Sequence, residues 1–254
     1  SKAKKPLIIS GGGVLFSQAS GALKDFAEKH GIPVCETQAG KSSLPHDHPL
    51  NMGSIGVTGT SAANELAREA DVVLAVGTRL QDFTTGSWTA FSKAAKIISV
   101  NVGRFDATKH RSLAVVGDAK LALSQLSAEA GSYHAPKSWG AFASRQREGW
   151  NVYVDGNINA VAASGSNRPM SYAQVIGAIN AICAPGDRII AAAGGLPAEV
   201  TANWRTKSLG SVDVEFGYSC MGYEIAGGWG ARIAQMEDQP DQDTIVFTGD
   251  GSYL

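Results

Sequence analysis

The sequence has almost no net charge and few cysteines. Its 22 basic and 23 acidic residues leave a formal net charge of -1, so electrostatics gives no reason to expect nucleic acid or an anionic membrane as a partner. The three cysteines, Cys35, Cys183 and Cys220, lie far apart and form no Cys-x-x-Cys pair. This spacing predicts a reducing compartment, the cytoplasm, and neither a disulfide scaffold nor a cysteine-based zinc site.

Long hydrophobic runs are also missing. No apolar run approaches the length that spans a bilayer, so no membrane segment is predicted. The basic start from Ser1 to Pro6 precedes only a short apolar strand, which does not match a signal peptide. Hydrophobic residues make up 44% of the 254 residues and charged residues 18%, and this composition indicates a globular chain of one large or two ordinary domains.

Several well-known motifs are present only in part. Gly11–Gly13 lies between a predicted strand and a predicted helix, but Phe16 replaces the third glycine of a dinucleotide fingerprint, so a tight turn is the favoured interpretation. Gly40–Ser42 resembles the end of a P-loop whose opening glycine would be Cys35. Ser219 precedes its second glycine by one residue too many for a nucleophile elbow. Nucleotide hydrolysis and serine hydrolase chemistry are therefore disfavoured.

A histidine pair in the first half could be taken for metal ligands. His46 and His48 flank Asp47 in a loop between two prolines, with no third ligand nearby in the sequence. A solvated or locally hydrogen-bonded loop is the favoured interpretation.

Apolar strands alternate with amphipathic helices along the chain. Strands are predicted over residues 6–10, 31–35, 71–76, 96–101, 113–116, 188–192, 212–214 and 244–248. Helices are predicted over residues 17–29, 60–69, 118–126 with Asp118 as cap, 138–150, 171–183 with Ser171 as cap, and 222–235. This alternation predicts an α/β fold, with a Rossmann-like parallel-sheet domain over residues 1–132, a linker over 133–169 and the first part of a second α/β domain over 170–254.

Three glycine-bearing loops follow one another in the second half. Ala193–Leu196 and Gly249–Ser252 come after predicted strands, and Gly217–Gly222 opens a predicted helix. Open α/β sheets bind ligands at the carboxyl ends of their strands, and helix amino termini favour anions. Asp250 between two glycines is a candidate Mg²⁺ ligand, because Mg²⁺ prefers one or two carboxylates with phosphate oxygens. For the tripeptide alone, a hairpin turn is the favoured interpretation.

The ordered set of loops resembles the pyrophosphate-binding domain of thiamine-diphosphate enzymes of the acetolactate synthase type. The resemblance implies cofactor contacts at Gly194, Gly195, Leu196, Ser219, Met221, Gly249, Asp250, Gly251 and Ser252. Asp250 would bind Mg²⁺, and Met221 would prop the cofactor in its bent shape. Ser219 stands where the family usually has glycine, so the local backbone must adopt a conformation that suits serine.

Longer segments resemble the same family more specifically. Glu36–Ser42, Gly53–Thr60 and Val76–Phe83 resemble its central domain, which binds FAD or a nucleotide in several relatives, although FAD is not expected here. Phe216–Gly227 and Asp82–Thr85 resemble the members that act in myo-inositol catabolism. The resemblance implies hydrolytic ring opening of a small cyclic dione, 3D-trihydroxycyclohexane-1,2-dione, to 5-deoxy-glucuronate.

The resemblance also implies an internal piece of a longer enzyme. The family's pyrimidine-binding domain with its activating glutamate, and the asparagine that completes the metal site, would both lie outside this chain. We therefore expect no catalytic residue in the 254 residues and no activity from them alone, with thiamine diphosphate and Mg²⁺ not necessarily bound. The parent enzyme is expected to form a homodimer or tetramer with a second copy of its chain.

Two alternatives remain open at this point. One is an acetolactate synthase-type enzyme, or another 2-oxo-acid or semialdehyde decarboxylase with the same cofactor. The other is a non-catalytic nucleotide-binding module built on the first half.

Overall fold

The computed structural model describes residues 2–160, 169–192, 194–215 and 217–253. Residues 161–168 of the predicted linker, Ala193 of the first predicted loop and Phe216 at the start of the segment Phe216–Gly227 lie outside the described residues. The strands are β1 (Pro6–Ser10), β2 (Val34–Glu36), β3 (Asn51–Ser54), β4 (Val72–Val76), β5 (Lys96–Asn101), β6 (Leu113–Val116), β7 (Arg188–Ala191), β8 (Val212–Val214) and β9 (Thr244–Phe247). The helices are α1 (Gly12–Phe16), α2 (Ser20–His30), η1 (Gln38–Gly40), α3 (Ser61–Glu69), α4 (Asp82–Thr85), α5 (Arg104–Ala107), η2 (Lys109–Arg111), α6 (Ala119–Glu129), α7 (Lys137–Ile158), α8 (Tyr172–Ile182), α9 (Leu196–Asn203), α10 (Tyr223–Asp238) and α11 (Asp250–Tyr253).

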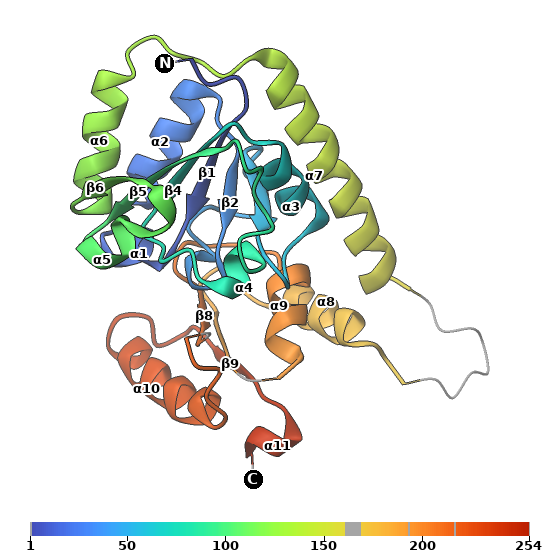
Figure 1. The fold of residues 1–254 in the computed structure, drawn as a ribbon. Coiled ribbons are helices and arrows are strands. Elements are labelled where there is room, and N and C mark those ends of the chain that lie inside the picture. The colour runs from blue at the N-terminus through green and yellow to red at the C-terminus, as the bar shows by residue number, and fades with distance from the viewer. Residues whose placement is uncertain (1, 161–168, 193, 216, 254) are drawn as a thin grey trace.

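The first unit is built on a six-stranded parallel sheet in the order β3-β2-β1-β4-β5-β6. Helices α2 and α6 cover one face, and α3 and α7 cover the other (Figure 1). Because both faces are covered, the central strands β1 and β4 are apolar except for Ser10, and all five residues of β1 are buried. The parallel α/β architecture predicted from the alternating pattern is confirmed.

Two predicted helix caps are confirmed. The Asp118 side chain accepts hydrogen bonds from the N–H groups of Lys120 and Leu121 at 2.9 and 3.0 Å. Ser171 and Gln174 form a reciprocal capping box at the start of α8. Both side chains satisfy backbone donors that the first turn of a helix leaves without intrahelical partners.

Helix α7 is longer than the sequence pattern predicts. The prediction ends at Trp150 because Gly, Asn and Ser follow, but the helix continues to Ile158. Val154 in this extension is 3% exposed and packs inside the protein. Tertiary packing therefore overrides the weak helix propensity of the segment.

The second unit has a three-stranded parallel sheet in the order β8-β7-β9. Its core includes Trp204 and Phe247, whose rings meet edge to face with centroids 6.0 Å apart. Helix α10 packs so close to β9 that a Cβ on Gly228 would collide with the Val246 side chain.

Gly11 and Gly13 serve the packing of the first unit. A Cβ on Gly13 would lie 2.6 Å from Gly77 Cα, and one on Gly11 would meet the Gly77 carbonyl. These glycines therefore allow the loops after β1 and β4 to touch, as the tight-turn interpretation predicts.

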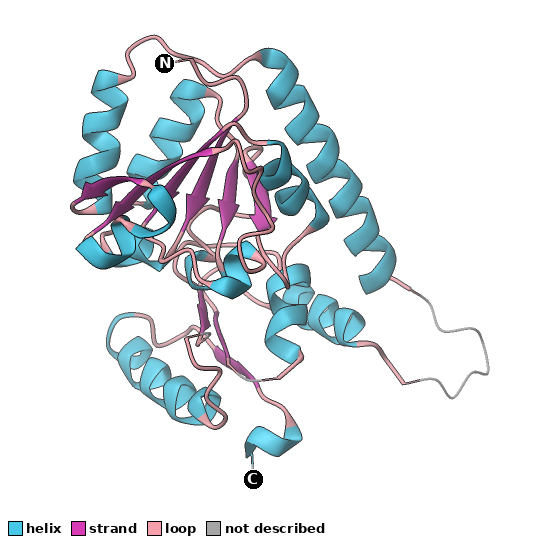
Figure 2. Ribbon diagram, viewed as in Figure 1, coloured by secondary structure: helices cyan, strands magenta, loops and turns pink. Residues whose placement is uncertain are grey.

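The second unit lies below the carboxyl edge of the first sheet, as Figure 2 shows. The contact includes backbone hydrogen bonds from His46 N to Thr206 O at 2.9 Å and from Gly210 N to Ser42 O at 3.2 Å. The Ser54 hydroxyl donates to Thr201 O at 3.4 Å. In the part of the chain that the structure describes, no helix has both the length and the apolar character needed to cross a bilayer.

Candidate functional site

The three predicted glycine loops meet at one edge of the second sheet. The first follows β7, the third follows β9, and the second connects β8 to α10. Because β7, β8 and β9 are parallel neighbours, their carboxyl ends lie on the same edge. The three loops, which follow one another in the sequence, therefore lie together at this edge.

Direct contacts join the second loop to the other two. The Ser219 hydroxyl donates to Ala192 O at 3.5 Å, beside the first loop. Met221 Cε lies 3.6 Å from the position that a Cβ on Gly251 would take. The second loop therefore bridges the first and the third, and the Met221 side chain, 64% exposed, stands over the third.

The third loop is a helical start. Ser252 N and Tyr253 N both donate to Gly249 O, at 3.0 and 3.2 Å, and close the first turn of α11 at Asp250. The hairpin alternative for the Gly-Asp-Gly tripeptide is therefore wrong. Asp250 is exposed at the end of β9, with its carboxylate available to a ligand.

Ser219 adopts the left-handed backbone conformation that glycine favours. Its φ angle is +55°, and this conformation costs a residue with a side chain about 1–2 kcal/mol. The sequence raised this point, because the resembling family usually has glycine at this position.

A pair of substitutions tests the backbone at Ser219. Ser219→Gly should change the free energy of unfolding by less than about 0.5 kcal/mol, because relief of strain is offset by greater freedom of the unfolded chain. Ser219→Val should lose about 2 kcal/mol, because a β-branched residue is a strong outlier at positive φ. Urea unfolding of both variants measures the difference, and equal stabilities would contradict the assigned conformation.

Glu215 organises the second loop and was missed from the sequence. Its Oε1 accepts a hydrogen bond from Tyr218 N at 3.0 Å, and its Oε2 accepts one from Cys220 N at 2.9 Å. Burial alone would raise the pKa of Glu215, but the N–H groups of residues 217–220 lower it below its ordinary value of 4.5. The available signal was an acidic residue directly after the short strand β8 and just before a glycine loop.

The lowered pKa of Glu215 predicts an acid-sensitive loop. Its stabilising effect is fully present above pH 4.5 and is lost as the pH falls through the lower pKa of the folded state. Glu215→Gln should therefore lower the Tm at pH 7, and the gap from wild type should narrow toward pH 3. The exposed Glu237→Gln on α10 is the control. A gap that stays constant with pH would contradict the role of the carboxylate.

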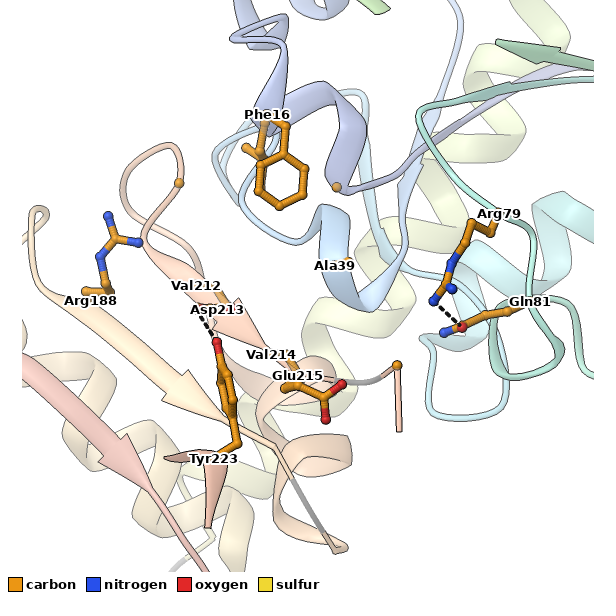
Figure 3. Close-up of a pocket in the computed structure, with 14 residues that line it drawn as sticks. Phe16, Ala39, Arg79, Gln81, Arg188, Val212, Asp213, Val214, Glu215 and Tyr223 are labelled. Atoms are coloured by element: carbon orange, nitrogen blue, oxygen red, sulfur yellow. Dashed lines mark hydrogen bonds between the residues drawn. The ribbon is translucent and has the colours of Figure 1, made fainter. Parts of the chain in front are cut away.

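A cleft of about 530 Å³ runs from the base of the second loop to the first unit. Figure 3 shows Arg79 and Gln81 of the first unit on one wall and Glu215 and Tyr223 on the other. Tyr223 donates to Asp213 Oδ2 at 3.0 Å. Burial, with the Asp213 carboxylate beside it, raises the pKa of Tyr223 to about 12, so the phenol stays protonated.

The histidine pair of the first half lies away from the three loops. His48 Nε2 lies 3.1 Å from Glu28 Oε1, and His46 lines a cavity beside α7. Burial, followed by the charges of Lys41, Arg205 and Arg147, lowers the pKa of His46 to about 3. Such cationic surroundings disfavour a metal cation at His46.

The glycine loops have room for a phosphorylated group. Among the described residues, apart from the chain neighbours of each glycine, no atom lies within 4 Å of where a Cβ would stand on Gly194, Gly195 or Gly249. Gly194 has a φ of +82°, so its backbone turns in a way open to glycine. Among the described residues, no group of three or more His, Cys, Asp and Glu could hold a metal ion by itself. A cation beside Asp250 would therefore take its other ligands from a bound phosphate, from water or from residues outside the described ones.

Comparisons with known proteins match both halves of the chain. Residues 1–126 match the family model described as thiamine pyrophosphate enzyme, central domain. Residues 192–254 match the C-terminal thiamine pyrophosphate binding domain of the same enzymes.

Similar curated proteins carry one name. The chain is 38% identical over 270 residues to the 3D-(3,5/4)-trihydroxycyclohexane-1,2-dione hydrolase of Geobacillus thermodenitrificans, covering 99% of this chain and 41% of that protein. It is 40% identical over 283 residues to the hydrolase of that name from Clostridium perfringens, covering 99% and 42%. The chain thus spans about two fifths of the length of these relatives.

Proposed function

Because the chain belongs to the thiamine pyrophosphate enzyme family, we propose that it is part of an enzyme that uses thiamine diphosphate and Mg²⁺ to open the ring of 3D-trihydroxycyclohexane-1,2-dione by hydrolysis of a C–C bond. The observation that carries the proposal is the meeting of three glycine loops at one sheet edge, with Asp250 exposed among them. The names of the relatives support the choice of a cyclic dione.

Each loop would have its own task. Asp250 would hold Mg²⁺, and Gly249, Gly251 and Ser252 would hold the diphosphate together with the loop Gly194–Leu196. The exposed Met221 would support the heterocycle, and the backbone at Ser219 would hydrogen-bond to it. When bound, the cofactor supplies a carbon nucleophile and an electron sink, while the protein supplies orientation and charge.

Glu215 would set the geometry of the second loop. Its carboxylate is held by two loop N–H groups, so it fixes the loop from beneath without contacting the cofactor. Preorganised backbone donors lower the entropic cost of binding.

The domain division and the assembly are part of the same proposal. We assign residues 1–132 to the central domain, 133–169 to the linker and 170–254 to the cofactor-binding domain. An exposed apolar stripe on α10, formed by Ile225, Trp229, Ile233 and Met236, supports a homo-oligomer in which a second copy covers this helix.

An assay with two substrates tests the function. With thiamine diphosphate and Mg²⁺, the purified parent enzyme that contains this chain should convert the cyclic dione to 5-deoxy-glucuronate and leave pyruvate unchanged, and the 254 residues alone should convert neither. Conversion of pyruvate alone would favour the acetolactate synthase-type alternative. Tight NAD or FAD binding without binding of thiamine diphosphate would favour the nucleotide-binding module and overturn the proposal.

A further inference from the structure

Helix α10 buries a carboxylate in its first turn. Glu224 is 0% exposed, although Ile225 and Ala226 beside it are exposed. Gly228, four residues later, lies on the same side of the helix and packs against Val246 of β9. Glu224 therefore lies on the face that the helix turns toward the sheet, one turn nearer the second loop. A buried carboxylate is costly unless it is hydrogen-bonded, so this position calls for a partner and a role.

The Glu224 carboxylate holds the backbone just before the helix. Its Oε2 accepts a hydrogen bond from Gly222 N at 3.1 Å. Gly222 has a φ of +89°, a conformation that glycine adopts readily. Because a peptide bond is planar, this hydrogen bond fixes the orientation of the whole peptide group between Met221 and Gly222.

Met221 lies between two amides that carboxylates hold. Glu215 accepts from Cys220 N at 2.9 Å before it, and Glu224 accepts from Gly222 N after it. The Met221 side chain is 64% exposed and stands over the third loop. Because a methionine side chain has three rotatable bonds, the backbone at its base largely decides where it stands.

The same peptide group lies against the third loop. A Cβ on Gly222 would lie 4.0 Å from Ser252 O. A shift of Gly222 would therefore change the contact between the second and third loops together with the position of Met221.

We propose that Glu224 is a positioning residue for Met221. Since its side chain is buried, it acts through the Gly222 peptide and not by contact with a ligand. The inference rests on the proposed function, in which Met221 supports the heterocycle of thiamine diphosphate. Glu224 thus governs the affinity for the heterocycle, whereas Asp250 governs the affinity for the diphosphate.

Two ligands separate this role from a general structural one. Calorimetry with Mg²⁺ measures how the parent enzyme that contains this chain binds thiamine diphosphate and inorganic pyrophosphate, which has no heterocycle. Glu224→Ala should weaken binding of thiamine diphosphate about tenfold, because a hydrogen bond to a charged group is lost, and should leave pyrophosphate binding unchanged. Glu224→Gln keeps an oxygen acceptor and should stay within about threefold of wild type. The exposed Glu237→Ala on α10 should bind both ligands as wild type does.

A double-mutant cycle tests whether Glu224 acts through Met221. In a Met221→Ala background, Glu224→Ala should change the affinity for thiamine diphosphate by less than about twofold, because the side chain that it positions is already absent. Glu224→Leu fills the buried space without an acceptor and takes the place of Glu224→Ala if that variant fails to fold.

Hydrogen exchange of the enzyme without ligands gives a measurement that does not depend on the cofactor. Glu224→Ala should speed exchange of the Gly222 amide about tenfold, and Glu237→Ala should not. Unchanged exchange at Gly222, equal losses for both ligands, or a full tenfold loss in the Met221→Ala background would overturn the proposal. Failure of the wild type to bind thiamine diphosphate would instead contradict the proposed function, and exchange at Gly222 would still decide whether Glu224 holds the loop.

Discussion

Gly56→Ala is expected to destabilise the protein by about 4 kcal/mol, near the upper end for a single substitution. Gly56 has a φ of +110°, which residues with a Cβ avoid. An alanine Cβ would also collide with Phe83 O and lie 2.8 Å from Thr84 Cα. Phe83 O accepts a hydrogen bond from Val57 N at 2.8 Å, so the collision would break a backbone contact as well.

The backbone around Gly56 cannot move aside. The Asn64 amide holds it from both ends, because Asn64 Oδ1 accepts from Gly56 N and Asn64 Nδ2 donates to Gly56 O, each at 2.9 Å. Relief of the collision would therefore cost these hydrogen bonds.

A glycine of α7 provides the control for Gly56→Ala. Outside the helix's own backbone, no atom of the described residues lies within 4 Å of a Cβ on Gly149. Gly149→Ala should therefore stabilise the helix by about 0.5–1 kcal/mol. Urea unfolding gives both free energies. If Gly56→Ala unfolded at the same urea concentration as wild type, the packing of this loop against α4 would be wrong.

The sequence predicted what local patterns encode. Apolar runs marked the buried strands, and Asp118 and Ser171 marked the starts of two helices, because caps and periodicity act within a few residues. The order of the glycine loops predicted their shared edge, because parallel strands end on the same side of a sheet.

The features that were not predicted depend on distant residues. Lys41 and Arg205 line one cavity although they lie in different units. The role of Glu215 depends on how the loop folds back over its carboxylate. Helix α7 extends to Ile158, beyond its predicted end at residue 150, because Val154 is buried inside the protein. Pairings between distant segments leave no periodic signal in the sequence, and only packing reveals them.

The conformation at Ser219 lies between the features that local patterns predict and those that depend on distant residues. The family usually has glycine at this position, and we expected a backbone conformation that suits serine. The φ of +55° instead lies in the left-handed region that glycine favours. The reason is tertiary, because Glu215 holds the N–H groups on both sides of Ser219. A family pattern can therefore mark a strained position without revealing what maintains it.

Asp250→Ala is expected to lower the affinity for thiamine diphosphate in the presence of Mg²⁺ by about 100-fold or more, because substitutions beside a bound metal already cost about 10–100-fold. The proposed site has one carboxylate for the cation, and the diphosphate depends on that cation to balance its charge. Calorimetric titration of the parent enzyme that contains this chain, with and without Mg²⁺, measures the loss. The wild-type protein should depend on Mg²⁺, and the variant should bind weakly in both conditions.

Two controls distinguish a lost metal ligand from a lost fold: the unfolding free energy of Asp250→Ala, and the affinity of a matched aspartate variant. Asp250 is exposed, so Asp250→Ala should change the free energy of unfolding by less than about 0.5 kcal/mol. Asp241 is an exposed carboxylate at the opposite end of β9, and Asp241→Ala should retain wild-type affinity. Asp250→Asn keeps one oxygen ligand without the charge. Its affinity for thiamine diphosphate should therefore lie between those of Asp250→Ala and the wild type. If Asp250→Ala bound the cofactor as tightly as Asp241→Ala, the cation would have to be held elsewhere, and the proposed task of the third loop would be wrong.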